Sequence, residues 1–117
     1  MGLDMFAGKT RKDVVDNTAV PIMEWRKHPD LHGYMQALYA SRSGCKDPMK
    51  FNKKPLFLSR QDLEDLRQAV LSGQLPKTEG HFFGESLPEE QHFDLIFIDG
   101  ACRLIDQGWN VFYDSWW

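Results

Sequence analysis

The sequence predicts an α+β protein: a small, mainly antiparallel sheet with about three helices packed on one face. Stretches with apolar residues at alternating positions are interspersed with stretches in which apolar residues recur every three or four positions. The predicted strands are short and their connections brief, which favours a small sheet with helices packed on one face. No repeat or linker divides the chain, so residues 1–117 are expected to form a single globular domain.

The first half of the chain predicts two strands and a helix. The strands are expected at residues 2–8 and 19–26, and Pro21 places the second at a sheet edge or delays its start. Asp30 is the expected N-cap of the helix, and Gly44 its terminator. An apolar stripe supports this helix: Leu31, Tyr34, Met35, Leu38 and Tyr39.

A loop at residues 44–55 and a short extended segment at 56–58 are followed by a second helix. Ser59 and Asp62 predict a capping box at its start, and Gly73 its end. Its apolar side consists of Leu63, Leu66, Val70 and Leu71.

The C-terminal part begins with a short strand predicted within residues 79–86. Ser86 is the expected N-cap of a helix over residues 88–107, which Gly108 stops before a final strand from Trp109. The predicted buried face of this helix is Phe93, Phe97, Ala101, Leu104 and Ile105.

Further expectations for this helix concern its glycine and its acids. Gly100 is interpreted as a close helix-to-sheet contact, because glycine weakens a helix by about 1 kcal/mol relative to alanine. The carboxylates of Asp94, Asp99 and Asp106 are interpreted as a solvated surface.

Composition narrows the function classes. The chain has no apolar run long enough to span a bilayer and no basic-then-apolar leader, so a cytoplasmic protein is expected. No phosphate loop, Gly-x-Ser-x-Gly elbow or Cys-x-x-Cys pair is present. Ser59 and Ser86 are interpreted as helix caps, and no cofactor or metal site is predicted. The sequence alone leaves the catalytic residues unknown.

Charge is divided unevenly along the chain. Residues 1–60 contain 11 Lys and Arg against 6 Asp and Glu, whereas residues 61–117 contain 3 against 11. Either the halves attract each other within one fold, or the molecule presents one basic and one acidic face. The segment 42–60, with Phe51 and Phe57 among basic residues, is a nucleic-acid-binding alternative that the acidic second half disfavours.

The C-terminus is unusually aromatic, with five aromatic side chains in the last nine residues. Strand alternation puts Val111, Tyr113 and Ser115 on one face, and Phe112, Asp114 and Trp116 on the other. If helices cover one face only, exposed aromatics remain on the other, and such patches favour a partner. The sequence therefore predicts a partner protein, with a second copy of the same chain as the expected form.

Four blocks resemble a family of small proteins from bacteriophages, including cyanophages, and from bacteria. The blocks are MGLDMF at 1–6, EWRKHPDLHG at 24–33, FFGES at 82–86 and FYDSWW at 112–117. The resemblance implies a phage-type accessory protein and no particular activity. If the blocks converge in space, they form a pocket or interface from Trp25, His28, His32, Phe83, Glu85, Asp114, Trp116 and Trp117.

The leading hypothesis is a non-enzymatic binding protein, a homo-oligomer that engages a host protein or a small ligand in host takeover or defence inhibition. One alternative is a small hydrolase or nucleotide-processing enzyme that uses His28, His32 or His81 with Asp114. Nucleic-acid binding is the second alternative, and no membrane partner is expected.

Overall fold

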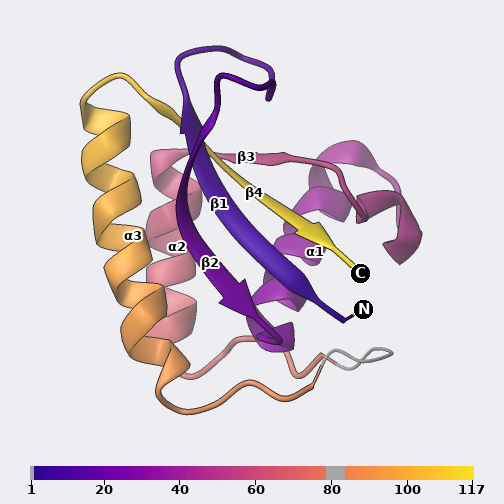
Figure 1. Cartoon of the computed structure of the whole chain (residues 1–117). Helices are drawn as coiled ribbons and strands as arrows, with labels where there is room; N and C mark the ends of the chain where they lie inside the picture. Colours follow the sequence, from indigo (N-terminus) through magenta and orange to yellow (C-terminus); the bar gives the residue numbers. More distant parts are fainter. Residues whose placement is uncertain (1, 79–83) are drawn as a thin grey trace.

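The computed structural model describes residues 2–78 and 84–117 and confirms the α+β class (Figure 1). These residues form one four-stranded antiparallel sheet and three α-helices. The elements are β1 (Asp4–Thr10), β2 (Val20–Arg26), α1 (Pro29–Ser43), the 3₁₀ helix η1 (Pro48–Phe51), β3 (Leu56–Leu58), α2 (Arg60–Leu71), α3 (Glu90–Asp106) and β4 (Asn110–Trp116).

The first and last strands form the centre of the sheet. The order is β2-β1-β4-β3, with every neighbouring pair antiparallel. Strand β4 pairs with β1 along its whole length, from Asp4 opposite Trp116 to Thr10 opposite Asn110, so the two ends of the chain lie side by side (Figure 1). Strand β2 lies at an edge, as Pro21 predicts.

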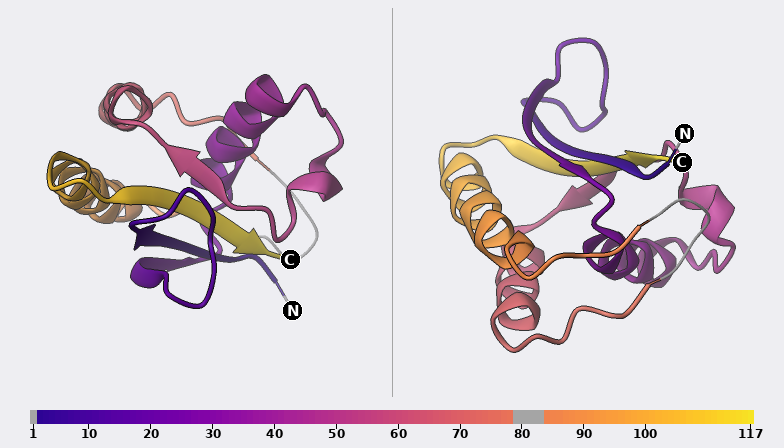
Figure 2. Two further views of the ribbon diagram at one scale, coloured as in Figure 1. Left: turned by 90° about the horizontal axis from the view of Figure 1, so that it is seen from above. Right: turned by 60° about the horizontal axis from the view of Figure 1, so that its bottom comes forward.

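All three helices cover the same face of the sheet, as the two views of Figure 2 show. Met5, Ala7, Val111 and Tyr113 point toward the helices and are buried. The alternate residues of the central strands, among them Phe6, Phe112, Asp114 and Trp116, lie on the uncovered face. The predicted alternation along the last strand and the one-sided helix layer are confirmed.

Helix α1 begins two residues earlier than predicted, at Pro29, and Asp30 is not its N-cap. His28 occupies the cap position without a capping side-chain hydrogen bond. The amide of Asp30 donates instead to Ser86 Oγ at 3.1 Å, so a distant serine caps this helix. Gly44, with φ at 72°, ends the helix as predicted.

Helix α2 confirms its predicted capping box between Ser59 and Asp62, and Gly73 follows its end in a left-handed conformation. Its apolar side differs from the prediction at Leu71, which is 54% exposed.

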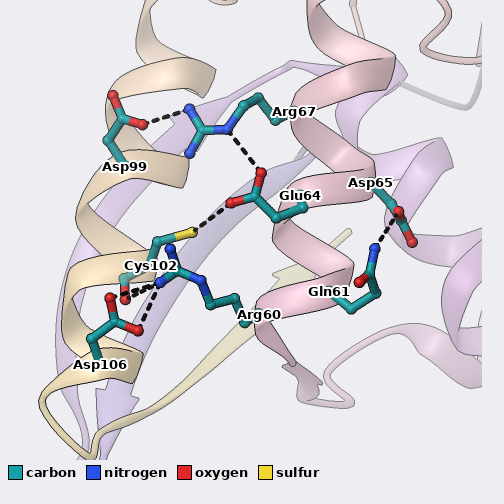
Figure 3. A network of polar contacts seen from close by, with 8 residues as sticks. All are labelled: Arg60, Gln61, Glu64, Asp65, Arg67, Asp99, Cys102 and Asp106. Carbon is teal, nitrogen blue, oxygen red and sulfur yellow. Dashed lines mark hydrogen bonds and ion pairs between the residues drawn. The ribbon is translucent and has the colours of Figure 1, made fainter.

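Ion pairs join α2 to α3 (Figure 3). Arg60 binds Asp106 at 2.7 Å, and Arg67 binds Asp99 at 2.5 Å. Charges of the basic and the acidic half therefore meet inside one fold at Arg60 and Asp106.

Helix α3 differs most from expectation. It begins at Glu90, and Ser86 does not cap it. Its buried residues are Asp94, Phe97, Ile98, Ala101 and Cys102, whereas Phe93 is 47% exposed. The buried face of α3 is rotated relative to the predicted one, because the Asp94 side chain points into the protein and hydrogen-bonds there to Trp25 and His28.

The structure also differs from the prediction in two other segments. The loop 44–55 contains η1, which buries Phe51 completely. Of the strand predicted within 79–86, residues 84–86 are not extended into a sheet, and residues 79–83 lie outside the described part of the chain.

Gly33 and Gly100 give opposite predictions for the same substitution. A Cβ at Gly33 would lie 1.8 Å from Oγ1 and 2.9 Å from Cβ of Thr78, so Gly33 lets that segment dock against α1. A Cβ at Gly100 meets nothing within 4 Å, which contradicts the predicted close contact there.

Gly33→Ala is expected to lower the free energy of unfolding by about 1–3 kcal/mol, and Gly100→Ala to raise it by about 1 kcal/mol. Urea denaturation of both variants measures this; equal shifts would contradict the docking of Thr78 on α1.

Candidate functional site

A buried carboxylate organises the first candidate site. The Asp94 side chain is 1% exposed and lies in α3 beneath the end of β2. Trp25 Nε1 donates to its Oδ1 at 3.2 Å, and His28 Nε2 lies 2.8 Å from its Oδ2. The Trp25 ring also packs edge-on against Phe97, with centroids 5.0 Å apart. These contacts satisfy a charge whose burial without partners costs several kcal/mol.

The hydrogen-bonded chain continues from His28 to Ser86. His28 Nδ1 lies 2.6 Å from Ser86 Oγ, which also accepts from the amide of Asp30. The chain borders a cavity of about 420 Å³ between the start of α1, the end of α2 and the start of α3. Glu90 lines the same cavity, and burial raises its carboxyl pKa, an effect that His28 opposes and Asp94 reinforces.

His32 belongs to a second, aromatic cluster. It is fully buried, and its Nδ1 lies 2.8 Å from the hydroxyl of Tyr113. The Trp117 ring packs edge-on against the imidazole at a centroid distance of 4.7 Å, and Phe51 stacks on it at 5.5 Å. Burial lowers the pKa of His32 to about 4, so this histidine is neutral at physiological pH.

Trp117 is held at both its backbone amide and its backbone oxygen by one side chain, that of Asn52. Asn52 Nδ2 donates to the carbonyl oxygen of Trp117 at 2.8 Å, and the amide of Trp117 donates to Asn52 Oδ1 at 3.2 Å. The aromatic end of the chain therefore closes the core over His32.

The uncovered sheet face contains the third candidate site, a cavity of about 450 Å³. Phe6, Phe112 and Trp116 form much of its wall, together with Pro21 of the edge strand. Gly8 makes room for the Phe112 ring, since a Cβ there would lie 2.5 Å from Phe112 Cζ. The remaining lining residues are Asp4, Val15, Asp16, Ala19 and Glu24.

Asp114 points to the same uncovered face, opposite Phe6 of β1. Its carboxylate accepts from the amide of Ser115 at 2.8 Å. Burial raises its pKa, and the Ser115 hydrogen bond partly offsets this.

The residues expected to form one pocket are distributed over three places. Trp25 and His28 lie with Asp94, His32 and Trp117 lie in the aromatic cluster, and Asp114 and Trp116 lie on the uncovered face. The prediction that His28 pairs with Asp114 is wrong, because the acid beside His28 is Asp94. Glu85 is exposed next to Ser86, and Phe83 and His81 lie outside the described residues.

The basic segment 42–60 offers less than its sequence suggests. Phe51 is fully buried and cannot stack on a base. Arg42 is bound to Asp62, and Arg60 to Asp106. The nucleic-acid alternative therefore loses one of its two interleaved aromatics, since Phe57 is only partly buried.

Sequence reasoning missed the roles of Asp94 and Ser86. Asp94 was interpreted as solvated, although it lies three and four residues before Phe97 and Ile98 on the buried stripe. An acid in that register signals a buried partner. No local pattern could indicate that Ser86 serves a helix more than fifty residues away.

Within residues 2–78 and 84–117, no three His, Cys, Asp or Glu side chains converge as metal ligands, and no helix is long and apolar enough to cross a membrane. Comparisons with protein-family models, curated proteins and solved structures gave no match. The geometry of the three sites is therefore the basis for assigning a function.

Protonation of His32 is expected to make the fold acid-sensitive. An unfolded histidine titrates near pH 6.5 and folded His32 near pH 4, so the unfolded state takes up the proton first as pH falls. Stability from this group is complete above pH 6.5 and is lost between pH 6.5 and 4. The loss amounts to about 3 kcal/mol.

Urea denaturation at pH 7.5 and pH 4 measures this loss in the wild type and in His32→Leu. The variant loses stability at both pH values because Tyr113 loses its hydrogen-bond partner, but its difference between the two pH values should be smaller by about 3 kcal/mol. Equal pH differences would contradict the assignment of the acid sensitivity to His32.

Proposed function

We propose that the protein is a binding protein whose uncovered sheet face receives a basic and apolar segment of another protein. The observation that supports this proposal is the cavity of about 450 Å³ on that face, which combines an apolar wall with carboxylates. Among the aromatic rings of this wall, Trp116 is half exposed and Phe112 is buried, and an exposed ring beside an apolar cavity favours a partner. The function needs no chemistry, only complementarity of shape and charge.

The charge of the cavity favours a cationic occupant. Asp4, Asp16 and Glu24 line it, and none of its described lining residues is basic. Asp4 lies 3.5 Å from Arg26, and Asp16 lies 2.6 Å from Lys12, but these pairs are at the surface. Exposed pairs contribute little to stability, so an incoming Lys or Arg side chain can replace such a partner.

Trp116 is the expected anchor of the interface. Its side chain is 53% exposed, and tryptophan is among the residues that contribute most to protein interfaces. Lys53 already places its ammonium group 5.4 Å from the centre of the Trp116 ring. A cation of the partner would use the same ring by the same attraction.

The resemblance to phage accessory proteins makes a host protein the expected partner, in host takeover or in inhibition of a defence. A second copy of the chain is the alternative occupant, because its first sixty residues carry the net positive charge. Dependence of the molar mass on protein concentration distinguishes the second copy from a different protein.

Short labelled peptides test the proposal. Peptides that alternate Lys or Arg with Leu or Phe are expected to bind, and more weakly as salt is added, whereas matched acidic peptides should not bind. Trp116→Ala and Glu24→Lys are each expected to weaken binding of the basic peptide at least about tenfold in fluorescence anisotropy.

Phe93→Ala is the matched control, because Phe93 is an aromatic residue of similar exposure (47%) on α3, away from the cavity. It should leave peptide affinity unchanged. Equal binding of basic and acidic peptides, or equal effects of the Trp116 and Phe93 variants, would show that the uncovered face is not the binding surface.

A further inference from the structure

The groups around His28 constrain the direction of its hydrogen bonds. The amide of Asp30 can only donate, so Ser86 Oγ accepts there and keeps its own proton for another partner. An ionised Asp94 carboxylate can only accept, so His28 Nε2 is the nitrogen that donates to it, and in the neutral form of the ring the single proton is then on Nε2. His28 Nδ1 is then a lone pair facing the Ser86 hydroxyl at 2.6 Å.

From this arrangement we propose that Ser86 is a nucleophile, that His28 is its general base and that Asp94 positions the base, in a site that hydrolyses small carboxylic esters. A serine that only caps α1 needs an acceptor oxygen and nothing more. A base beside the hydroxyl, with a buried carboxylate behind the base, is the arrangement that activates serine in unrelated hydrolase folds. Here the ring is reversed, with Nδ1 toward the serine and Nε2 toward the acid.

The adjoining cavity suits a small acyl group. Its volume of about 420 Å³ lies within the usual range of small-molecule sites. Val70, Leu75 and Leu87 provide an apolar lining, and Ser86 lies at its border. Lys77 also lines the cavity and contributes a positive charge for the oxyanion that develops when an ester carbonyl is attacked.

The reaction balances without any cofactor. Ser86 Oγ bonds to the ester carbonyl carbon while His28 Nδ1 takes the hydroxyl proton, and the oxygen–carbon bond to the leaving alcohol then breaks as Nδ1 returns that proton to the alcohol. Water next attacks the acyl-serine carbonyl carbon and gives a proton to Nδ1. The bond to Oγ breaks and Oγ recovers the proton, so ester and water become acid and alcohol.

Two residues act through His28 and do not touch the substrate. Asp94 Oδ2 holds Nε2–H and stabilises the imidazolium that forms during attack. Trp25 fixes the other carboxylate oxygen through its indole N–H. This site lies on the helix side of the sheet, separate from the uncovered face, so hydrolysis and protein binding can succeed or fail independently.

A fluorophosphonate probe and p-nitrophenyl butyrate test the proposal on the full chain. The wild type is expected to be labelled on the tryptic peptide 78–103, in which Ser86 is the only serine. Ester turnover should fall to the buffer rate in Ser86→Ala. In Asp94→Asn, kcat should fall by about 10²–10⁴-fold with KM nearly unchanged, because Asp94 acts on the base and not on substrate binding.

Ser41→Ala is the matched control, since Ser41 is exposed near the C-terminal end of α1, the end opposite to His28. It should keep full labelling and turnover, with folding of every variant checked by circular dichroism. If Ser86→Ala does not fold, the labelled peptide of the wild type decides the question. Absence of labelling and turnover in the folded wild type, labelling at another serine, or undiminished turnover in folded Ser86→Ala would overturn the proposal.

Discussion

The buried carboxylate of Asp94 is the constraint on which much of the structure depends. A carboxylate that is 1% exposed must be satisfied by fixed donors, and Trp25 and His28 are those donors, 69 and 66 residues away in the chain. Meeting this requirement joins the end of β2 and the start of α1 to α3. It also sets the rotation of α3, because the face that includes Asp94 must point inward and Phe93 is thereby turned to the surface.

Because the helices cover only one face of the sheet, charged and aromatic side chains have different surroundings on the two sides. On the covered side, basic residues are used internally, as Arg60 with Asp106 and Arg67 with Asp99 show (Figure 3). On the other side, carboxylates line a cavity beside the half-exposed ring of Trp116. The uneven charge of the sequence is thus partly neutralised between α2 and α3, whereas the carboxylates at the uncovered face, Asp4, Asp16 and Glu24, come from the first half of the chain.

Regular periodicity and capping made most elements predictable from sequence. The Ser59 capping box, the Gly44 and Gly108 helix stops and the edge position of the strand containing Pro21 all depend on local backbone chemistry, and all are found. The sites were less predictable because they depend on contacts distant in sequence. The register of Asp94 on α3 indicates a buried acid, but its partners Trp25 and His28 are identified only in the folded structure. The expectation of one pocket was wrong because adjacent strand residues, such as Asp114 and Tyr113, face opposite sides of the sheet.

Ser86 caps α1, which is distant in sequence, and not α3, which follows it in the chain. The first amides of α3 are satisfied by carbonyls of the preceding turn, since Glu90 N donates to Leu87 O at 3.0 Å and Gln91 N to Pro88 O at 3.3 Å. That helix therefore does not need the serine hydroxyl. Helix α1 does need it, because His28 at its cap position offers no side-chain acceptor to the amide of Asp30. Once Ser86 meets that need, its oxygen lies beside the imidazole that occupies the cap position, 2.6 Å from His28 Nδ1. The requirement of an uncapped helix thus brings a serine hydroxyl, a histidine and a buried acid into line.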